Sequence, residues 1–370
     1  MIEAAANAWS EFDQESEQWG VSPRPRQPRP IVVIGAGGIV DNAHLPAYAR
    51  AHFPVAAIAD TALSKAEALA KKFHVQRAFG SVAEIIRFAP ADAVYDIAVP
   101  AGNLLDVLPQ LPDGAAVLMQ KPMGETLDDA RRIRELCHEK SLKAAVNFQL
   151  RYAPSILAAR TLQRKGMLGK VHDMEVQVRT HMPWAQWTFL AKAPRLEVLY
   201  HSIHYVDLIR SWFGDPLSVY ARTLRNPGTP ELQATKSILI MDYGEWRRAF
   251  IATNHNYRFD EEYERAFVQW EGTEGAMRAT LGVILDYPRG KPDRLGSSIR
   301  KHPVWMEHPI DGQWFPDAFA GAMGSLQAFV EGSAKFLPTS VDDAYRTMKV
   351  VEAIYSSSQK GGEPLVWEEL

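Results

Sequence analysis

The chain has 370 residues, of which 46% are hydrophobic and 23% charged, and its formal charge at pH 7 is -3. This is the composition of a globular protein with room for two domains. The near-balanced charge gives no electrostatic reason to expect a nucleic acid or an anionic membrane as partner, and the single cysteine, Cys137, excludes an intrachain disulfide.

The first 28 residues differ from the rest of the chain. Their acidic start lacks the basic and apolar segments of a secretory signal. No later apolar run approaches the about 20 residues that span a bilayer, so we expect a cytoplasmic protein. The prolines of "SPRPRQPRP" block both helix and central strand. We therefore predict an N-terminal arm over residues 1–28.

From residue 29 to residue 150, short apolar strands alternate with helical stretches. The predicted strands are "IVVIG", "VAAIAD", "AVYDIAVP", "AAVLMQKP" and "LKAAVNFQLR". Their continuous apolar character is typical of strands covered on both faces. The segment "SKAEALAKKF" has the apolar spacing of a surface helix, and Thr126 precedes acids in the first turn of another. This alternation predicts an α/β domain with a mostly parallel, doubly wound sheet.

Residues 151–370 show a different pattern, in which apolar and polar residues alternate. The predicted strands are "KVHDMEVQVRTHMP", "LSVYARTL", "KSILIMDYG", "RRAFIATNHNY" and "ERAFVQWEG". Such alternation is typical of a half-exposed antiparallel sheet. We expect helices to cover one face, and the other face to need a partner because large sheet faces are rarely left bare.

A glycine-rich turn directly follows the first strand. Gly35 permits a tight turn, Gly37 and Gly38 let the backbone approach a pyrophosphate, and the next helix offers free N–H groups at its N-terminus. The third position of the dinucleotide fingerprint is Val40 rather than Gly or Ala. By itself the turn is weak evidence, because an ordinary strand-to-helix turn has the same glycines.

The end of the second strand strengthens this prediction. Asp60 lies twenty residues after Val40, where the ribose-binding carboxylate is expected. Together the strand, turn, helix, strand and acid predict a dinucleotide site. Asp60 would repel a 2′-phosphate and so favours NAD, whereas the nearby Lys65 leaves NADP possible.

Lys121 follows a strand that is apolar enough to be buried. Pro122 turns the chain out of the sheet immediately afterwards. Lys121 should therefore lie at the carboxyl edge, where doubly wound folds bind ligands. Beside an oxidised nicotinamide its pKa would fall, and it would then bind a substrate hydroxyl and help to remove its proton. A surface lysine at a strand end is the alternative.

The segment "VLYHSIHYVDLIRSWFG" places His201, His204 and Asp207 three residues apart. Such spacing on a helix raises the possibility of a metal-dependent hydrolase or lyase. Asp207, however, is about 120° around an α-helix from His201, so the three side chains do not converge on one ion. No further cluster supplies a missing ligand, and we predict no metal site.

Taken together, these motifs resemble the Gfo/Idh/MocA oxidoreductase family. The resemblance rests on the glycine-rich turn, Asp60, Pro100 and "QKP", which stands where the family has Glu-Lys-Pro. It also rests on "FVQWEGTEGAMRATLG", which resembles a Gly-Thr-x-Gly hairpin, and on the C-terminal helical region. The likeness runs from about residue 30 to residue 368 and leaves out only the arm.

The resemblance implies a Rossmann domain over residues 29–150 and a substrate-binding and oligomerisation domain over residues 151–370. Its open sheet would form the interface of a homodimer or homotetramer. The implied activity is hydride transfer between NAD, or NADP, and a hydroxyl-bearing carbon of a sugar, sugar acid, polyol or inositol. Relatives that use tightly bound NAD for oxidation with isomerisation or elimination are alternatives, as is a non-catalytic cofactor-binding regulator.

The resemblance also assigns site residues. His204 matches the family histidine that faces the nicotinamide, Tyr200 stands where many members have aspartate, and both share one face of an α-helix. His201 is a second-rank candidate, and Asp207 would orient His204 or cap a neighbouring element. Other departures are Gln120 at the family glutamate and Leu104 at a frequent histidine.

The expected catalytic residues are Lys121, His204, Tyr200 and His201. The expected cofactor-binding residues are Gly35, Gly37, Gly38, Ile39, Val40, Asp60, Pro100, Asn103, Gln120, Lys121 and Gln149. The expected substrate contacts are Lys121, Asn147, Arg151, Arg179, Trp184, Trp187, Tyr200 and His204. Arg195 is also of a residue type that binds sugar hydroxyls or a carboxylate. The tryptophans would stack on pyranose faces, although anchoring a structural loop is an equal alternative for them.

Overall fold

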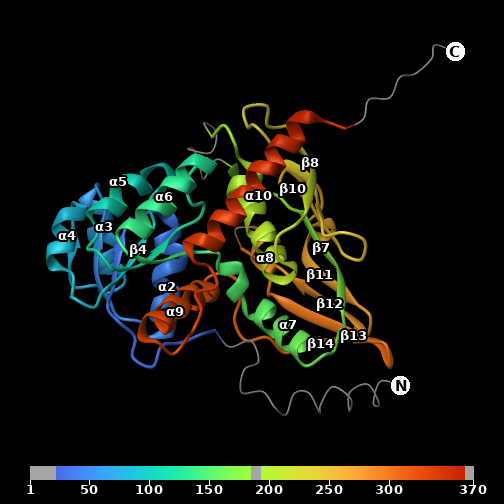
Figure 1. Ribbon diagram of the computed structural model, residues 1–370, viewed down its shortest axis with the longest axis horizontal. Coiled ribbons are helices and arrows are strands. Elements are labelled where there is room, and N and C mark those ends of the chain that lie inside the picture. The colour runs from blue at the N-terminus through green and yellow to red at the C-terminus, as the bar shows by residue number, and fades with distance from the viewer. Residues whose placement is uncertain (1–21, 185–192, 288, 363–370) are drawn as a thin grey trace.

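The computed structural model describes residues 22–184, 193–287 and 289–362, so Trp187 lies outside the described residues. The chain forms two β-sheets with helices packed around and between them (Figure 1). Both predicted sheet types are present, the first parallel and the second mainly antiparallel.

The first sheet has six parallel strands in the order β3-β2-β1-β4-β5-β6. This is the doubly wound order whose switch point, between β1 and β4, opens a crevice for a dinucleotide. The strands are β1 (Ile31–Ile34), β2 (Val55–Ala59), β3 (Ala78–Phe79), β4 (Val94–Ile97), β5 (Ala116–Met119) and β6 (Lys143–Val146). Every residue of β1, β4 and β5 is buried, as continuous apolar runs predict.

Helices connect these strands. They are η1 (Val40–His44), α2 (Leu45–Ala51), α3 (Leu63–Lys72), α4 (Val82–Phe88), η2 (Ala101–Asn103), α5 (Leu104–Val107), η3 (Leu108–Gln110) and α6 (Leu127–Glu139). Thr126 starts α6 with a capping box, in which its side chain and that of Asp129 each accept the other's backbone N–H. Cys137 is buried in α6, in accordance with a core position.

The second sheet has eight strands in the order β14-β13-β12-β11-β7-β10-β9-β8, and β7 pairs with β10 in parallel. The strands are β7 (Val171–Arg179), β8 (Ser218–Leu224), β9 (Lys236–Asp242), β10 (Arg248–Asn254), β11 (Arg265–Gly272), β12 (Gly275–Thr280), β13 (Arg294–Ile299) and β14 (His302–His308). The helical segments are η4 (Gln149–Tyr152), α7 (Pro154–Arg164), η7 (Val198–Ser202), α8 (Ile203–Phe213), η8 (Glu261–Tyr263), η9 (Gly282–Ile284), α9 (Asp317–Glu331) and α10 (Val341–Lys360).

The two faces of the second sheet differ. Helices α7, α8 and α10 lie on the side that faces the first domain (Figure 1). The exposed large apolar side chains of β8, β9 and β14 are Tyr220, Leu224, Ile238, Ile240 and Trp305. One face is therefore covered by helices, and apolar side chains remain exposed on these strands. No helix in the described part of the chain is long and apolar enough to cross a membrane.

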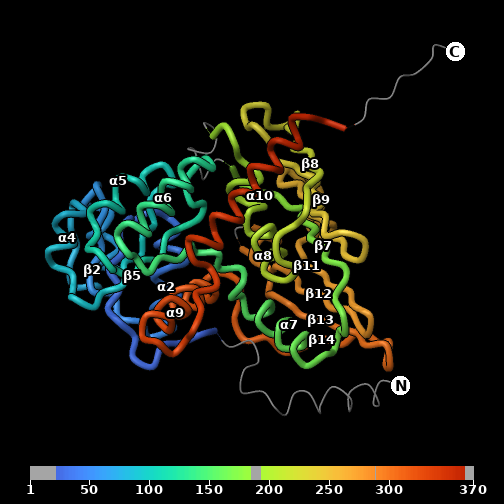
Figure 2. The backbone as a smooth tube through the Cα atoms, in the orientation of Figure 1, coloured from blue at the N-terminus to red at the C-terminus, as the bar shows by residue number. Residues whose placement is uncertain are grey.

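Helix α9 joins the two halves of the chain. It belongs to the C-terminal half in sequence, yet it packs against β5, β6 and α2 of the first domain (Figure 2). The described end of the N-terminal arm lies along it, because the N–H groups of Arg26 and Gln27 donate to the Glu331 carboxylate. A Cβ at Gly324 would lie 2.1 Å from the carbonyl oxygen of Pro23, so this glycine permits the close approach of the arm.

Candidate active site

The glycine-rich turn lies where β1 meets the next helix. Gly35 has φ +111°, and a Cβ there would lie 2.4 Å from the carbonyl oxygen of Ala98, so β1 and β4 approach too closely for any larger residue. A Cβ at Gly37 would meet nothing within 4 Å, and both Gly37 and Gly38 are exposed. The turn thus leaves open space over the end of β1, as a bound pyrophosphate requires.

Val40, the bulky residue at the third position of the fingerprint, lies at the start of an irregular helical turn. Val40 is fully buried, and the chain from Val40 to His44 is a π-helix instead of the first turn of an α-helix. The wider turn occurs where the fingerprint normally has a small residue. The predicted helix is present, but it begins irregularly and becomes α-helical only at Leu45.

Asp60 closes the other side of this turn. Its Oδ2 accepts the N–H of Ala36 at 2.8 Å, and its Oδ1 accepts the N–H of Ala62 at 2.8 Å. The carboxylate therefore ties the end of β2 to the glycine-rich turn, while its side chain stays partly exposed. A fixed carboxylate at this point fits a ribose diol and disfavours a 2′-phosphate.

The other expected cofactor contacts gather at the carboxyl ends of β4 to β6. Pro100 and Asn103 are exposed just after β4. Gly37 and Gly38 are exposed just after β1, which is the neighbouring strand in the sheet. Asn147 and Gln149 follow β6 and are almost completely buried, with exposures of 0% and 1%. Among the described residues, both amide atoms of Asn147 and the Oε1 of Gln149 have no hydrogen-bond partner. Buried amides of this kind need a ligand or water.

Gln120 is the middle of a buried chain of hydrogen bonds. Its Oε1 accepts the backbone N–H of Lys121 at 2.8 Å, which leaves its amide NH2 to donate to Nε2 of His44 at 3.0 Å. Nδ1 of His44 then carries the proton and donates to Asp96 at 2.7 Å. Tyr48 donates to the same carboxylate. Gln120 thus links the buried His44 to the backbone beside Lys121.

Lys121 is at the carboxyl edge of the first sheet, as the sequence predicts. Its Nζ donates to the backbone carbonyl oxygen of Tyr200 at 2.7 Å. Burial lowers the pKa of this amine to about 8. No carboxylate in the described part of the chain lies within ion-pair distance of it. Lys121 can therefore exist as a neutral amine close to physiological pH.

The segment that carries the histidines is not a regular α-helix. Val198–Ser202 is a π-helix, and α8 begins at Ile203, so a count of 100° per residue fails across this stretch. The helical count applied to this stretch, which assumes an α-helix, therefore does not hold, and His201 stays a candidate beside His204. Lys121 acts electrostatically on both His201 and His204.

Both imidazoles are uncharged at neutral pH. Burial first, and then Lys121, hold the pKa of His204 well below its usual range. Burial, His255, Lys121 and His204 do the same, in that order, to the pKa of His201. Neutral imidazoles beside a low-pKa amine can accept protons, which is what general base chemistry needs.

Tyr200 contributes mainly through its backbone. Its hydroxyl lies 3.4 Å from Oε1 of Glu125, and burial, followed by Glu125, raises the pKa of the phenol to about 12. A phenol that stays protonated is a poor base at neutral pH. The predicted proton relay through this hydroxyl is therefore not favoured, and the carbonyl oxygen that holds Lys121 is its clearer role.

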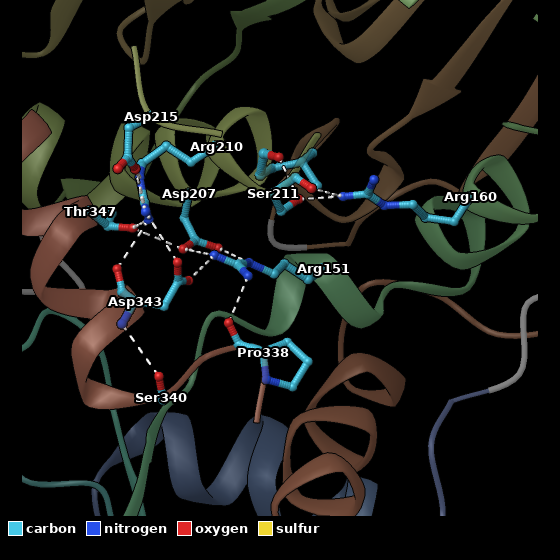
Figure 3. A network of polar contacts seen from close by, with 11 residues as sticks. Arg151, Arg160, Asp207, Arg210, Ser211, Asp215, Pro338, Ser340, Asp343 and Thr347 are labelled. Carbon is cyan, nitrogen blue, oxygen red and sulfur yellow. Dashed lines mark hydrogen bonds and ion pairs between the residues drawn. The ribbon is translucent and has the colours of Figure 1, made fainter. Parts of the chain in front are cut away.

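Of the two roles predicted for Asp207, orienting His204 is wrong, and the contacts of Asp207 are with neighbouring elements. Its two carboxylate oxygens accept Nε and Nη2 of Arg151, each at 2.6 Å, and Thr347 also donates to it (Figure 3). The side chain of Asp207 is 1% exposed and that of Arg151 is 11% exposed. The helix α8 is thereby fixed to η4 and α10, and Asp207 cannot complete a metal site with the histidines.

The same network corrects the assignment of Arg151 to the substrate. Besides Asp207, its guanidinium donates to Asp343 and to the carbonyl oxygen of Pro338 (Figure 3). Asp343 also accepts Arg210 of α8. Ion pairing, led by Asp207, outweighs burial and raises the pKa of Arg151. Arg151 is therefore a structural residue that joins η4 to α8 and α10.

The other predicted substrate contacts are dispersed. Arg195 is paired with Glu352 of α10 at 2.5 Å, which removes it from the sugar-binding candidates. Trp184 is buried, donates its indole N–H to Asn256 and packs edge-on against His201, so its role in the structure is to support that histidine. Arg179 is exposed at the end of β7, over the ring of Tyr257.

Several residues in the site were not singled out from the sequence. Asp96 is a charged residue within an otherwise apolar strand, which is a local sign that it has a buried partner. That partner is His44. Trp314 packs edge-on against His204, with ring centroids 5.6 Å apart. His255 lies against His201 and Glu197 lies against His255, and nothing in their local sequence marks them. In the described ranges, no group of three or more His, Cys, Asp or Glu could hold a metal ion.

An open glycine-rich turn at the switch point of a parallel sheet, close to a low-pKa amine and neutral imidazoles, defines the class of nicotinamide-dependent oxidoreductases. The family models agree. Residues 29–148 match the oxidoreductase family with an NAD-binding Rossmann fold, and residues 156–278 match the GFO/IDH/MocA C-terminal domain. The chain belongs to the GFO/IDH/MocA family, so the resemblance and the cofactor class predicted from the sequence are confirmed.

Named relatives and solved structures are similar along most of the chain. D-apiose dehydrogenase of Paraburkholderia graminis is 24% identical over 83% of this chain and 81% of its own length. D-glucoside 3-dehydrogenase of Escherichia coli is 23% identical over 90% of this chain and 96% of its own. An oxidoreductase from Agrobacterium radiobacter, solved in complex with NAD+, L-tartaric acid and magnesium, shares the fold with a TM-score of 0.76 and 19% identity, covering 91% of this chain and 98% of that one.

Proposed function

We propose that the chain is an NAD-dependent dehydrogenase that transfers a hydride between the cofactor and a hydroxyl-bearing carbon of a sugar, sugar acid, polyol or inositol. The observation that carries the proposal is the buried amine of Lys121, whose pKa is lowered to about 8 beside two neutral histidines. The names of the similar D-apiose and D-glucoside dehydrogenases support a carbohydrate as substrate.

The cofactor would be held by the open turn at Gly37 and by Asp60, whose carboxylate is fixed by two backbone N–H groups. The fixed carboxylate favours NAD over NADP. Bound there, the nicotinamide supplies a two-electron hydride acceptor. The unpartnered amides of Asn147 and Gln149 lie at the same sheet edge and can bind polar groups of cofactor or substrate.

The proton chemistry falls to Lys121 and His204. Neutral Lys121 binds the reacting hydroxyl and takes its proton while the carbon becomes a carbonyl. The carbonyl oxygen of Tyr200 holds the amine in place through a 2.7 Å hydrogen bond. Neutral His204, supported by the ring of Trp314, accepts or returns the proton as the reaction runs in either direction.

The test is a cofactor-linked screen of the purified protein. We expect absorbance at about 340 nm to rise with NAD and at least one compound from a panel of sugars, sugar acids, polyols and inositols. Lys121→Ala should lose about 100-fold or more in kcat/KM. Lys140→Ala, which breaks an ion pair with Asp113 outside the site, is the matched control and should retain full activity.

Two results would contradict parts of this proposal. Full turnover by Lys121→Ala excludes the proposed chemistry. Cofactor that stays bound through purification, with substrate consumed but no net NADH formed, replaces simple dehydrogenation by an internal redox cycle of isomerisation or elimination. Cofactor binding without conversion of any compound favours a regulator instead.

The proposal includes assembly through the second sheet, as a homodimer or homotetramer. Ile238 and Ile240 of β9 and Tyr220 of β8 are exposed, although apolar sheet faces are usually covered. Light scattering of the purified protein tests this, and Ile238→Glu should shift the measured mass toward the monomer. We also retain the cytoplasmic location, which the single buried Cys137 supports.

A further inference from the structure

A group of buried polar side chains lies against His201. The ring centroids of His201 and His255 are 4.8 Å apart. Nε2 of His255 lies 3.3 Å from Oε1 of Glu197, and the hydroxyl of Ser202 donates to the same oxygen at 2.6 Å. Glu197, His201 and Ser202 come from the π-helical segment and the residue before it, whereas His255 directly follows β10.

Glu197 is a deeply buried carboxylate that stays ionised. It is 0% exposed, and His255 is 2% exposed. Burial raises the pKa of Glu197, but the hydrogen bonds from His255 and Ser202 outweigh burial and lower it. A charge taken out of water costs several kcal/mol unless a partner compensates it. The negative charge of Glu197 can therefore stabilise a positive charge on His255.

Two buried ring nitrogen atoms of this group make no hydrogen bond to the described residues and are therefore available to bind a proton. In the described part of the chain, Nδ1 of His201 and Nδ1 of His255 are buried and have no hydrogen-bond partner. His201 lies within electrostatic reach of both Lys121 and His255. It directly follows Tyr200, whose carbonyl oxygen binds the Lys121 amine, and its ring packs against His255, which contacts the Glu197 carboxylate.

We propose that His201, His255 and Glu197 form a buried proton relay for the reaction at Lys121. This rests on the proposed function. The proton that leaves the substrate hydroxyl goes to the neutral amine of Lys121, and one proton passes from the ammonium through His204 to His201 and on to His255. The hydride leaves the same carbon with both bonding electrons, so one proton and one hydride are removed together. The imidazolium of His255 is paired with the Glu197 carboxylate, and carbonyl reduction returns the proton by the same path.

The relay accounts for a site that has tyrosine at position 200. Tyr200 cannot act as the counter-charge of an imidazolium, whereas Glu197, three residues earlier, reaches the histidines through His255. Titratable groups also face this set from the elements packed around it. They are Lys121 and His204 beside His201, and Tyr205 and Tyr355 beside Glu197.

Glu197→Gln tests the relay, since it removes the charge and keeps the shape and an oxygen for Ser202. We expect kcat/KM to fall about tenfold or more, with the affinity for NAD unchanged. The control is Glu352→Gln, the same exchange in the ion pair with Arg195 on α10, and it should leave the rate unchanged. His255→Asn should resemble Glu197→Gln, and the double variant should be no slower than either single variant.

A second readout does not depend on turnover. Histidine labelled with carbon-13 at Cε1 gives one NMR signal for each ring, and His201→Asn and His255→Asn assign the two signals. Glu197→Gln should move the protonation of the His255 ring to lower pH, because the carboxylate 3.3 Å from its Nε2 is gone. Unchanged titration curves would overturn the relay, and so would shifted curves with an unchanged rate. A wild-type protein that binds NAD but converts no substrate contradicts the proposed function instead, and the curves distinguish the two failures.

Discussion

The Nζ of Lys121 lies 2.7 Å from the backbone carbonyl oxygen of Tyr200. This hydrogen bond joins Lys121, which follows strand β5 of the Rossmann sheet, to the π-helix Val198–Ser202 of the second domain. It requires only a carbonyl oxygen from residue 200, and the side chain at that position does not take part. The contact therefore holds the amine in place independently of which side chain stands at position 200.

The lowered pKa of Lys121 predicts the pH profile of the reaction. Burial brings this pKa to about 8, so the ammonium dominates below that pH and the neutral amine above it. In the oxidising direction, log kcat/KM should rise with pH up to about 8 and then level off. The reverse reaction should lose activity over the same range. A flat oxidation profile between about pH 6 and about pH 9 would show that the amine is not the proton acceptor.

The hydroxyl of Tyr200 should be dispensable. Because its pKa is raised to about 12, it stays protonated throughout the working range. Tyr200→Phe keeps the carbonyl oxygen that binds Lys121, and we expect less than about a tenfold change in kcat/KM. His204→Asn serves as the comparison and should cost about 100-fold or more. A larger loss in Tyr200→Phe than in His204→Asn would restore the tyrosine relay.

The ion pair between Asp207 and Arg151 should stabilise the fold. Asp207→Asn leaves a buried guanidinium without one of its two carboxylate partners, and we expect the free energy of unfolding to fall by about 3 kcal/mol. Asp128→Asn is the matched control, since its pair with Arg131 is exposed to water and should contribute little to stability. Urea denaturation measures both. Equal losses in the two variants would contradict the structural role assigned to this pair.

Asp293 should make stability depend on pH. Its carboxylate accepts the N–H groups of Gly282 and Trp314, at 2.6 and 2.7 Å, and burial raises its pKa from 3.8 to about 6. The folded state then binds more protons than the unfolded state between these values. The contribution of Asp293 to stability is therefore fully present below about pH 4 and declines as pH rises through about 6.

Asp293→Asn removes the titrating carboxyl. Its amide NH2 replaces one of the two acceptor oxygens, so one of the two backbone N–H groups loses its acceptor. The difference in free energy of unfolding between wild type and variant should shrink by up to about 3 kcal/mol from about pH 4 to about pH 7. Denaturation at several pH values measures it. A difference that stays constant or grows over this range would show that burial does not raise this pKa.

The sequence predicted those features that depend on neighbouring residues. Continuous apolar runs such as "IVVIG" mark strands covered on both faces, and β1 is completely buried. Gly35, Asp60 and Lys121 were found in the same way, because a tight turn, a strand-end acid and a strand-end lysine are all visible over a few residues. All three were expected at strand ends, and the carboxyl ends of parallel strands meet at one edge of the sheet.

The prediction went wrong where the backbone departs from a regular helix. The count that placed Asp207 about 120° around from His201 assumed an α-helix, and Val198–Ser202 is a π-helix. A single wide turn is set by packing around it rather than by the propensities of its residues. Asp207 was assigned to His204 for a related reason, since sequence shows near neighbours and Arg151 is 56 residues away.

By itself, the sequence thus determined the fold class, the dinucleotide turn and the lysine at the sheet edge, since each is a short pattern with a local physical cause. Only the tertiary structure decided which charged groups meet. Asp207 belongs to Arg151, and Glu197 reaches His201 through His255, which lies 58 residues from Glu197 in the chain. Charges separated along the chain interact only after folding excludes water between them, and no local pattern records which pair the fold will bring together.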